Sequence, residues 1–215
     1  MATQNKLINP AAPNLPLGTE QYERRYQDQF TNILRLYFNQ LQNALTEITG
    51  NAGGRYLAFP YGAFSDFTDQ TTTVNTATLM TLDTTDFSNG VSVAANSKIT
   101  VEYAGVYNLQ FSAQLQNLDN APQDVFIWLK QNGTDITGST GLVGMPARKS
   151  AGVPFHDIKG WNYFLSMNAG DYVQIYWSTT NVDVTIQTYP ASGTPTKPST
   201  ASVVATLSFV SALPA

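Results

Sequence analysis

The stretch Val106–Gln116 reads VYNLQFSAQLQ, and its side chains alternate between two kinds. One set is apolar and includes Tyr107, Phe111 and Leu115, whereas the other set consists of Asn, Gln and Ser. A period of two with one apolar and one polar face is typical of a strand that is buried on one side. The stretch therefore predicts a half-buried β-strand in the middle of the C-terminal part of the chain.

Similar short runs surround this strand, and turn sequences separate them. Asn89-Gly90, Asn132-Gly133 and Ala169-Gly170-Asp171 are typical turns, and residues 190–198 (PASGTPTKP) are expected to form a loop. About ten short strands with no helix between them predict an antiparallel jelly-roll β-sandwich over residues 55–215. The strands are expected at residues 56–64, 77–82, 91–93, 99–103, 106–116, 125–129, 161–167, 172–179, 182–188 and 202–210.

Residues 19–50 carry a helical period instead. Thr19 is a predicted N-cap with Glu20 and Glu23 in the first turn, and Gly50 is a predicted stop. The apolar residues step by four and three, as in a coiled-coil seam, and further apolar residues widen that face. This pattern predicts a short trimeric coiled coil or a helix that docks on another protein; packing on the chain's own domain is the alternative. The seam comprises Phe30, Leu34, Tyr37, Leu41, Ala44 and Ile48, and Tyr22 and Tyr26 extend it upstream.

Residues 1–18 contain Pro10, Pro13 and Pro16, which predict an extended arm, with a disordered tail as the alternative. Asn51–Gly54 (NAGG) is a predicted hinge between the helix and the β domain. No apolar run has the length of a signal peptide or a bilayer span. We therefore expect a chain of three parts, made in a cytosol and without membrane insertion.

The composition excludes several classes of function. Lys plus Arg number 11 and Asp plus Glu 15, a net charge of −4 that argues against a nucleic-acid-binding protein. The absence of cysteine and the single histidine exclude disulfides, thiolate metal sites and two-histidine zinc sites. Neutral polar residues are abundant instead, with 26 Thr, 17 Asn and 14 Gln, as in many surfaces exposed outside cells. We expect a protein that is not an enzyme.

The sequence contains few candidate catalytic or metal-binding residues, and their pattern indicates these functions only weakly. His156 next to Asp157 lacks a nucleophile motif and is expected to be a loop histidine. Aspartate pairs can act in glycoside hydrolysis or bind calcium, but Asp is also common in turns. No cofactor is predicted, and calcium binding is an open alternative. The pairs are Asp66/Asp69, Asp83/Asp86 and Asp119/Asp124.

Three further features bear on partners. Phe126, Trp128 and Phe164 alternate with predicted core residues, so they are expected to pack on the second sheet or to form a subunit interface, with sugar stacking as a third possibility. Residues 138–144 (GSTGLVG) lack the Lys-Ser/Thr of a phosphate loop and are expected to be a loop or a subunit contact. The helix arginines, at positions 24, 25 and 35, form a solvated face or a docking surface.

Three segments resemble the C1q/TNF-like jelly-roll family. Residues 105–111 (GVYNLQF) are similar to its G-x-Y-x-F strand, residues 127–133 (IWLKQNG) to its V-x-L-x-K-N-G hairpin, and residues 167–173 (MNAGDYV) to its L-x-x-G-D-x-V turn. Gly105 is expected to permit a tight turn into its strand. The resemblance covers about residues 56–210, and residues 205–209 (ATLSF) depart from the family's glycine-aromatic ending. The motif positions are Gly105, Tyr107, Phe111, Asn132, Gly133, Gly170 and Asp171.

The N-terminal part, LPLGTEQYERRY followed by LRLYFNQL, resembles the start of structural proteins of tailed phages of marine and freshwater bacteria. The resemblance implies a homotrimer on the virion surface, made in the bacterial host, with a helical stalk and a jelly-roll knob. Arm and helix would dock on a phage capsid or tail protein, as in a head fibre, a decoration protein or a short tail fibre, with the capsid preferred. The alternative is a carbohydrate-binding adhesin that recognises a host-surface glycan.

Overall fold

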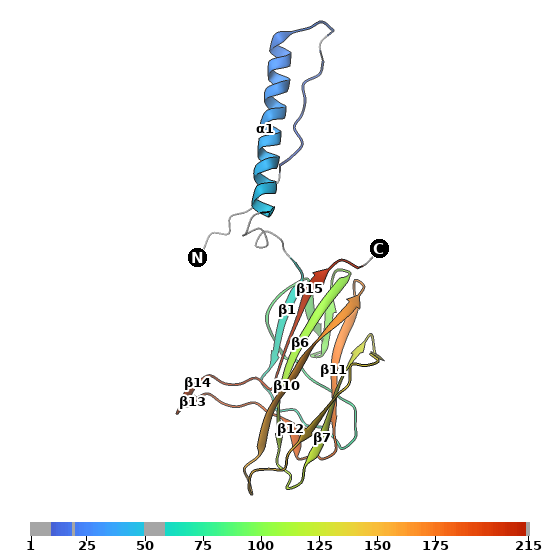
Figure 1. Cartoon of the computed structure of the whole chain (residues 1–215), viewed down its shortest axis with the longest axis vertical. Coiled ribbons are helices and arrows are strands. Elements are labelled where there is room, and N and C mark those ends of the chain that lie inside the picture. Colours follow the sequence, from blue (N-terminus) through green and yellow to red (C-terminus); the bar gives the residue numbers. More distant parts are fainter. Residues whose placement is uncertain (1–9, 19, 50–58, 214–215) are drawn as a thin grey trace. The chain divides into compact units, whose positions relative to one another are not determined.

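A computed structural model describes residues 10–18, 20–49 and 59–213. The chain divides into two compact units, residues 1–58 and 59–215. The first unit contains the helix α1 (Arg24–Thr49), and the second contains all the strands (Figure 1). The molecule is mainly β, with antiparallel sheets stacked as a sandwich, which confirms the predicted fold class. The predicted hinge at 51–54 lies outside the described residues.

Sheet A forms one layer of the sandwich. Its strands are β1 (Tyr61–Asp66), β3 (Thr84–Asn89), β6 (Gly105–Asn117), β10 (Phe155–Met167), β12 (Val184–Ile186) and β15 (Val203–Ser211). They are ordered β10-β6-β15-β1-β3, and β12 also pairs with β6. The central strand β6 thus lies between two strands that are distant from it in sequence, as the Greek-key connections of a jelly roll require.

Sheet B forms the other layer. Its strands are β2 (Thr78–Leu79), β4 (Val91–Ala94), β5 (Lys98–Val101), β7 (Gln123–Gln131), β8 (Thr134–Asp135), β9 (Gly141–Met145) and β11 (Tyr172–Thr179). They are ordered β4-β5-β11-β7-β8, with β2 on β11 and β9 on β7. A separate hairpin joins β13 (Ser192–Gly193) to β14 (Thr196–Lys197).

The core lies between the two sheets and confirms the alternation that was predicted for β6. Tyr107, Leu109 and Leu115 are fully buried, whereas the side chains that alternate with this apolar set, such as Asn108 and Gln110, face outward. From sheet B, Ile127 and Trp177 are equally buried and complete the same apolar cluster.

Several boundaries differ from the prediction. Strand β10 begins at Phe155 because it pairs with β6 over thirteen residues, so His156 lies in a strand and not in a loop. Residues 141–144 belong to β9, where Val143 is buried opposite β7, so the loop prediction for this part was wrong. Strand β3 was not predicted because its residues are mostly exposed and polar. The expected loop at 190–198 contains the β13–β14 hairpin.

The predicted turns at 132–133 and 169–171 are present, whereas the one predicted at Asn89-Gly90 is wrong, because only Gly90 separates β3 of sheet A from β4 of sheet B. Asn132 and Gly133 both have positive φ, at 51° and 82°, which is the backbone of a two-residue hairpin turn. Gly105 has another reason to be glycine. A Cβ atom there would lie 2.4 Å from the Phe209 ring, so close packing and not a turn requires it.

The start of α1 corrects the prediction for the first unit. The helix begins at Arg24, and the Glu23 carbonyl accepts its first hydrogen bond, from Gln27 N at 3.2 Å. Glu20 and Glu23 therefore precede the helix, and the predicted acidic first turn was wrong. Tyr22 also precedes the helix and is 83% exposed, so it does not extend the seam. The predicted N-cap Thr19 lies outside the described residues. The reason for the late start is that the chain reverses direction here, and a reversal requires non-helical backbone.

Candidate functional site: two interaction surfaces

The helix α1 presents an apolar face that its own chain covers only in part. None of its described residues, Arg24–Thr49, is buried. Tyr26, Ile33 and the six seam residues are half-buried, whereas Leu36 and Leu45 remain about half exposed, at 52% each. None of the helices in the described ranges is long and apolar enough to cross a membrane. The seam that was predicted from spacing is thus the most covered face of the helix.

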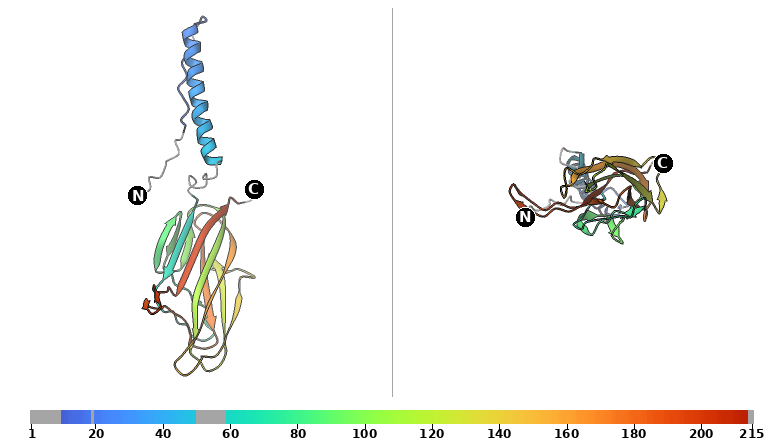
Figure 2. Two further views of the ribbon diagram at one scale, coloured as in Figure 1. Left: turned by 60° about the vertical axis from the view of Figure 1, so that its left-hand side comes forward. Right: turned by 90° about the horizontal axis from the view of Figure 1, so that it is seen from below.

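The N-terminal arm supplies part of that cover. Residues 10–18 run beside the helix in both side views (Figures 1 and 2), and the Tyr26 hydroxyl donates a hydrogen bond to the Pro16 carbonyl at 3.3 Å. Pro10, Pro13 and Pro16 are half-buried, whereas the residues between them are exposed. A period of three is that of a polyproline II helix, which has three residues per turn. The arm therefore presents a proline edge toward the helix.

The helix arginines lie outside the seam. Arg24 is 3.9 Å from Asp28, and the Arg35 guanidinium donates to the Asn32 side chain at 2.9 Å. All three arginines are exposed. An exposed ion pair of this kind contributes little to stability, so these side chains are available to a partner.

Part of the outer face of sheet A is a broad surface without Asp, Glu, Lys or Arg, whereas the edge strand β3 carries Asp86. This surface is formed by the outward residues of β6, β10 and β15, all of which the structure describes, and we call it the uncharged face. These residues are Val106, Asn108, Gln110, Ser112, Gln114, Gln116, His156, Ile158, Gly160, Asn162, Phe164, Ser166, Val204, Thr206 and Ser208.

The uncharged face has the properties of a buried contact. Ile158, Phe164 and Val204 are 59%, 56% and 38% exposed. The Asn108 side-chain oxygen is buried and has no hydrogen-bond partner among the described residues. Depletion of charge and exposed apolar side chains are features of surfaces that meet a partner.

The outer face of sheet B is different because it carries charge. Trp128 stacks on Tyr176 with ring centroids 5.8 Å apart, and its indole N–H donates to Asp135 at 2.8 Å. Lys130 pairs with Asp135 at 3.3 Å and lies 4.6 Å from the centre of the Tyr176 ring. Phe126 is also on this face, on the same strand as Trp128.

The three aromatic residues singled out from the sequence are therefore separated. Phe126 and Trp128 point outward from sheet B, whereas Phe164 points outward from sheet A. None of them packs in the core between the sheets. They cannot form one surface, and only Phe164 belongs to the uncharged face.

The family-motif residues hold turns together. The Asn132 side chain donates to the Asp171 carboxylate at 2.7 Å and accepts from Tyr172 N at 3.0 Å, which ties the β7–β8 turn to the turn before β11. The backbone N–H of Asn168, followed by the amides of neighbouring side chains, lowers the pKa of Asp171. Tyr107 donates to the Tyr103 carbonyl at 2.7 Å, and burial raises its pKa. Within the described residues these positions have a structural explanation.

The single histidine makes a polar contact with a tyrosine. His156 Nδ1 lies 2.8 Å from the Tyr189 hydroxyl. Partial burial, together with the nearby Lys149 charge, lowers the pKa of His156, so the ring is neutral at pH 7. Asp157, adjacent in sequence, points to the other side of the strand and pairs with Lys159 at 2.9 Å. Strand alternation thus separates the two residues whose adjacency was noted in the sequence.

Residues of the predicted aspartate pairs serve as hydrogen-bond acceptors, some in loops and some in strands, such as Asp66 at the end of β1. Asp66 is buried and accepts from Thr68 and Thr81, and Asp69 accepts from the backbone and hydroxyl of Thr188. Asp119 likewise accepts from side chains of two neighbouring segments. In the part of the chain that the structure describes, no three His, Asp or Glu side chains are grouped so that they could hold a metal ion.

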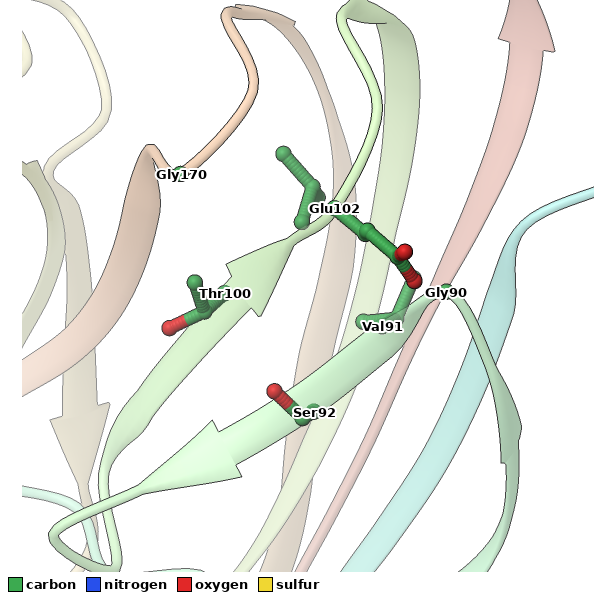
Figure 3. A pocket seen from close by; sticks show the side chains of 7 residues that line it. Gly90, Val91, Ser92, Thr100, Glu102 and Gly170 are labelled. Carbon is green, nitrogen blue, oxygen red and sulfur yellow. The ribbon is translucent and has the colours of Figure 1, made fainter.

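A hollow of about 490 Å³ lies at the end of β4 and β5. Glu102 is its only ionisable lining residue, and Ser92 and Thr100 contribute hydroxyls. In Figure 3 the Glu102 carboxylate lies beside Val91 and Gly90, and the Thr100 hydroxyl points away from it. These groups do not converge on one point, so the hollow lacks the arrangement of a catalytic site.

No protein-family model matches the chain, and no curated protein sequence is significantly similar to it.

Proposed function

We propose that the protein is a non-enzymatic structural protein of a tailed-phage virion, a homotrimeric short fibre or decoration knob that docks on the particle through its arm and helix. The observation that carries this proposal is the uncharged face of sheet A. The capsid surface is the preferred attachment site, because an arm and helix of this length are too short for a long tail fibre.

The size of the uncharged face suits a contact between subunits. Strands β6 and β10 are thirteen residues long, which corresponds to about 40 Å, and three strands span about 14 Å. The flat area is therefore about 600 Å², close to the roughly 800 Å² that each partner contributes to an ordinary stable interface. Neighbouring copies meeting there would cover Ile158 and Phe164.

The first unit of the chain supports two parts of the proposal, the helical stalk and the docking on a particle. A 26-residue helix without a buried side chain needs a partner for its apolar face. The choice of a trimer and of a phage particle follows from the resemblance of the three β segments to the C1q/TNF-like family and of the N-terminal part to phage structural proteins.

The proposal is tested by the solution mass of matched variants. Wild-type protein is expected at about three times the 23.4 kDa chain mass in light scattering after size exclusion. Phe164→Asp, on the uncharged face, is expected to lower this mass toward that of a monomer, because it buries an unpaired charge in the contact. Leu142→Asp is the control, since Leu142 is an exposed apolar residue (64%) on the outer face of sheet B.

The outcomes separate clearly. A monomeric wild-type protein contradicts the homotrimer. A trimeric wild-type protein whose mass is unchanged in Phe164→Asp contradicts the assignment of the contact to sheet A.

The docking part has its own test. Deleting residues 1–50 is expected to leave a folded knob that no longer joins phage particles. Particles that incorporate the shortened chain at the wild-type level would contradict docking through the arm and helix.

Glycan binding remains the second candidate, and the Trp128–Tyr176 cluster on sheet B is where it would occur. Aromatic rings of this kind stack on sugars, but here Tyr176 is already in contact with Trp128 and Lys130. A glycan array probed with wild-type protein and with Trp128→Ala tests this candidate. Binding that Trp128→Ala removes would support the adhesin function.

A further inference from the structure

Residues 190–199 leave the sandwich as a projecting hairpin (Figure 2). Ser192 pairs with Lys197 and Gly193 with Thr196, and a bridge between Tyr189 and Thr200 closes the base. In this segment only Ser192 is half-buried, and all the other residues are exposed. The hairpin is therefore a protrusion and not part of the packed domain.

The hairpin has little to hold it in place by itself. Its side-chain hydrogen bonds are local: Thr196 donates to the Gly193 carbonyl at 3.3 Å, and Lys197 donates to the Pro190 carbonyl at 3.4 Å. A two-stranded hairpin without an apolar face is marginally stable in water. A second surface that covers it would supply the missing stabilisation.

The base of the hairpin lies on the same side of the sandwich as the uncharged face. The Tyr189 hydroxyl contacts His156 of that face, and Gln187 N donates to the carbonyl of Gln114 at 2.8 Å. Subunits that meet through the uncharged face therefore bring this hairpin next to the neighbouring copy.

The uncharged face contains a hollow that fits the chemistry of the hairpin. It measures about 500 Å³ and surrounds Gly160, where a Cβ atom would lie only 2.0 Å from the Phe111 carbonyl oxygen. No larger residue can fill this position without moving the backbone. The hollow is lined by Gln110, Ser112, Ile158, Gly160, Trp161 and Asn162.

The two surfaces complement each other without charge. The hairpin sequence PASGTPTKP has three prolines, which lack an N–H, so its backbone has more hydrogen-bond acceptors than donors. Gln110 and Asn162 offer amide N–H groups, and Ile158 offers an apolar side chain of the kind on which prolines pack. Lys197, the only charged residue of the segment, is already turned toward the Pro190 carbonyl.

We propose that the hairpin of one subunit docks in the Gly160 hollow of a neighbouring subunit and clasps the two copies together. This contact rests on the proposed homotrimer and adds a named segment and a named receiving site to it. It turns an otherwise flat contact between sheets into an interlocked one.

Cysteine cross-linking of the full chain tests the contact directly, because the chain has no cysteine of its own. Thr196→Cys combined with Asn162→Cys is expected to give chains linked by disulfides, seen as dimer and trimer bands on a non-reducing gel. Thr196→Cys combined with Thr134→Cys, which lies on exposed strand β8 of sheet B, is the control pair. Equal amounts of linked chains in both pairs, or links within one chain only, would overturn the proposal.

A second variant measures the strength of the clasp. Replacing residues 191–198 by Asn-Gly keeps the Tyr189–Thr200 base and is expected to leave the melting temperature of the knob unchanged. The trimer is expected to dissociate at a protein concentration at least about tenfold higher than the wild type. An unchanged dissociation concentration would contradict the clasp.

The two levels of the proposal fail in different ways. The hairpin contact is overturned if the wild-type protein is trimeric, the cysteine pairs give no specific cross-links and the shortened variant dissociates at the same concentration as the wild type. These results would leave the homotrimer in place. A monomeric wild-type protein overturns both.

Discussion

The helix unit and the sandwich unit were both recognised from the period of their apolar residues, yet they use these residues differently. The sandwich buries the apolar side of β6 against sheet B, so that Tyr107 and Trp177 are fully buried. The helix buries none of its described residues, and its seam is only half covered. A sequence period therefore identifies an element and its apolar face, but it does not identify what covers that face.

The difference has an energetic consequence. Isolated helices depend on intrinsic propensity and a few side-chain pairs, and exposed pairs such as Arg24–Asp28 add at most about 1 kcal/mol. The sandwich is stabilised by its core, where each fully buried large side chain adds about 1.5–3 kcal/mol. We expect the knob to fold by itself and the helix to depend on its partners.

The largest expected effect contrasts one leucine from each unit. Leu109→Ala removes a fully buried side chain and is expected to lower the free energy of unfolding of the knob by about 2–5 kcal/mol. Leu36→Ala, on the exposed side of α1, is expected to change it by less than about 0.5 kcal/mol. Urea unfolding followed by tryptophan fluorescence measures both, and similar losses in the two variants would remove the contrast between the units.

A smaller effect tests how tightly the backbone of the sandwich is packed. Gly160→Ala places a Cβ atom 2.0 Å from a backbone oxygen and is expected to cost about 1–3 kcal/mol. Gly193→Ala, in the projecting hairpin, meets no atom within 4 Å and is expected to be neutral. The melting temperatures of the two variants give the comparison; a neutral Gly160→Ala would show that the strands can separate locally.

A pH dependence follows from the link between the two turns of the knob. The pKa of Asp171 is lower in the folded state than in the unfolded state, where it is near 3.8. The ionised carboxylate therefore stabilises the fold fully at pH values above the unfolded pKa. This stabilisation is lost as the pH falls through the folded pKa. Asp171→Asn is expected to be less stable than the wild type at pH 7 and equally stable near pH 2. Urea unfolding across this range measures the difference, with Asp183→Asn on an exposed loop residue as the control. A difference that persists at pH 2 would assign the effect to packing.

The smallest expected effect lies in the helix unit. Tyr26→Phe removes the hydrogen bond to Pro16 and is expected to cost about 0.5–1.5 kcal/mol of local stability where the arm meets the helix. Amide hydrogen exchange in residues 11–18 is expected to accelerate, whereas exchange in β6 stays the same. Slowed or unchanged exchange in the arm would show that the arm is held by other contacts.

Local patterns predicted many elements but not all. The alternation of β6 and the Asn132-Gly133 turn were readable because each depends on neighbouring residues only. Strand β9 and the first half of β10 were missed because their place in a sheet depends on strands far away in sequence. The helix start was placed too early because the reversal of the arm is a tertiary feature.

The candidate surfaces were likewise predicted only where they depend on neighbouring residues of the sequence. The seam of the helix followed from the spacing of its apolar residues, whereas no local pattern indicated that the proline arm would lie beside it. The uncharged face could not be read from the sequence, because it is assembled from three strands separated by up to about a hundred residues. The hollow at Gly160 depends on the same pairing of strands.

The sequence by itself determined that this chain has an amphipathic helix before an antiparallel β domain, because the period of apolar side chains is a local property of the backbone geometry. It also limited the set of possible catalytic groups, since the chain has one histidine and no cysteine. Only the tertiary structure decided which outward residues share a surface, where the hairpin projects and which buried groups are left without partners. Strand pairing decides these features, because it joins residues that are distant along the chain.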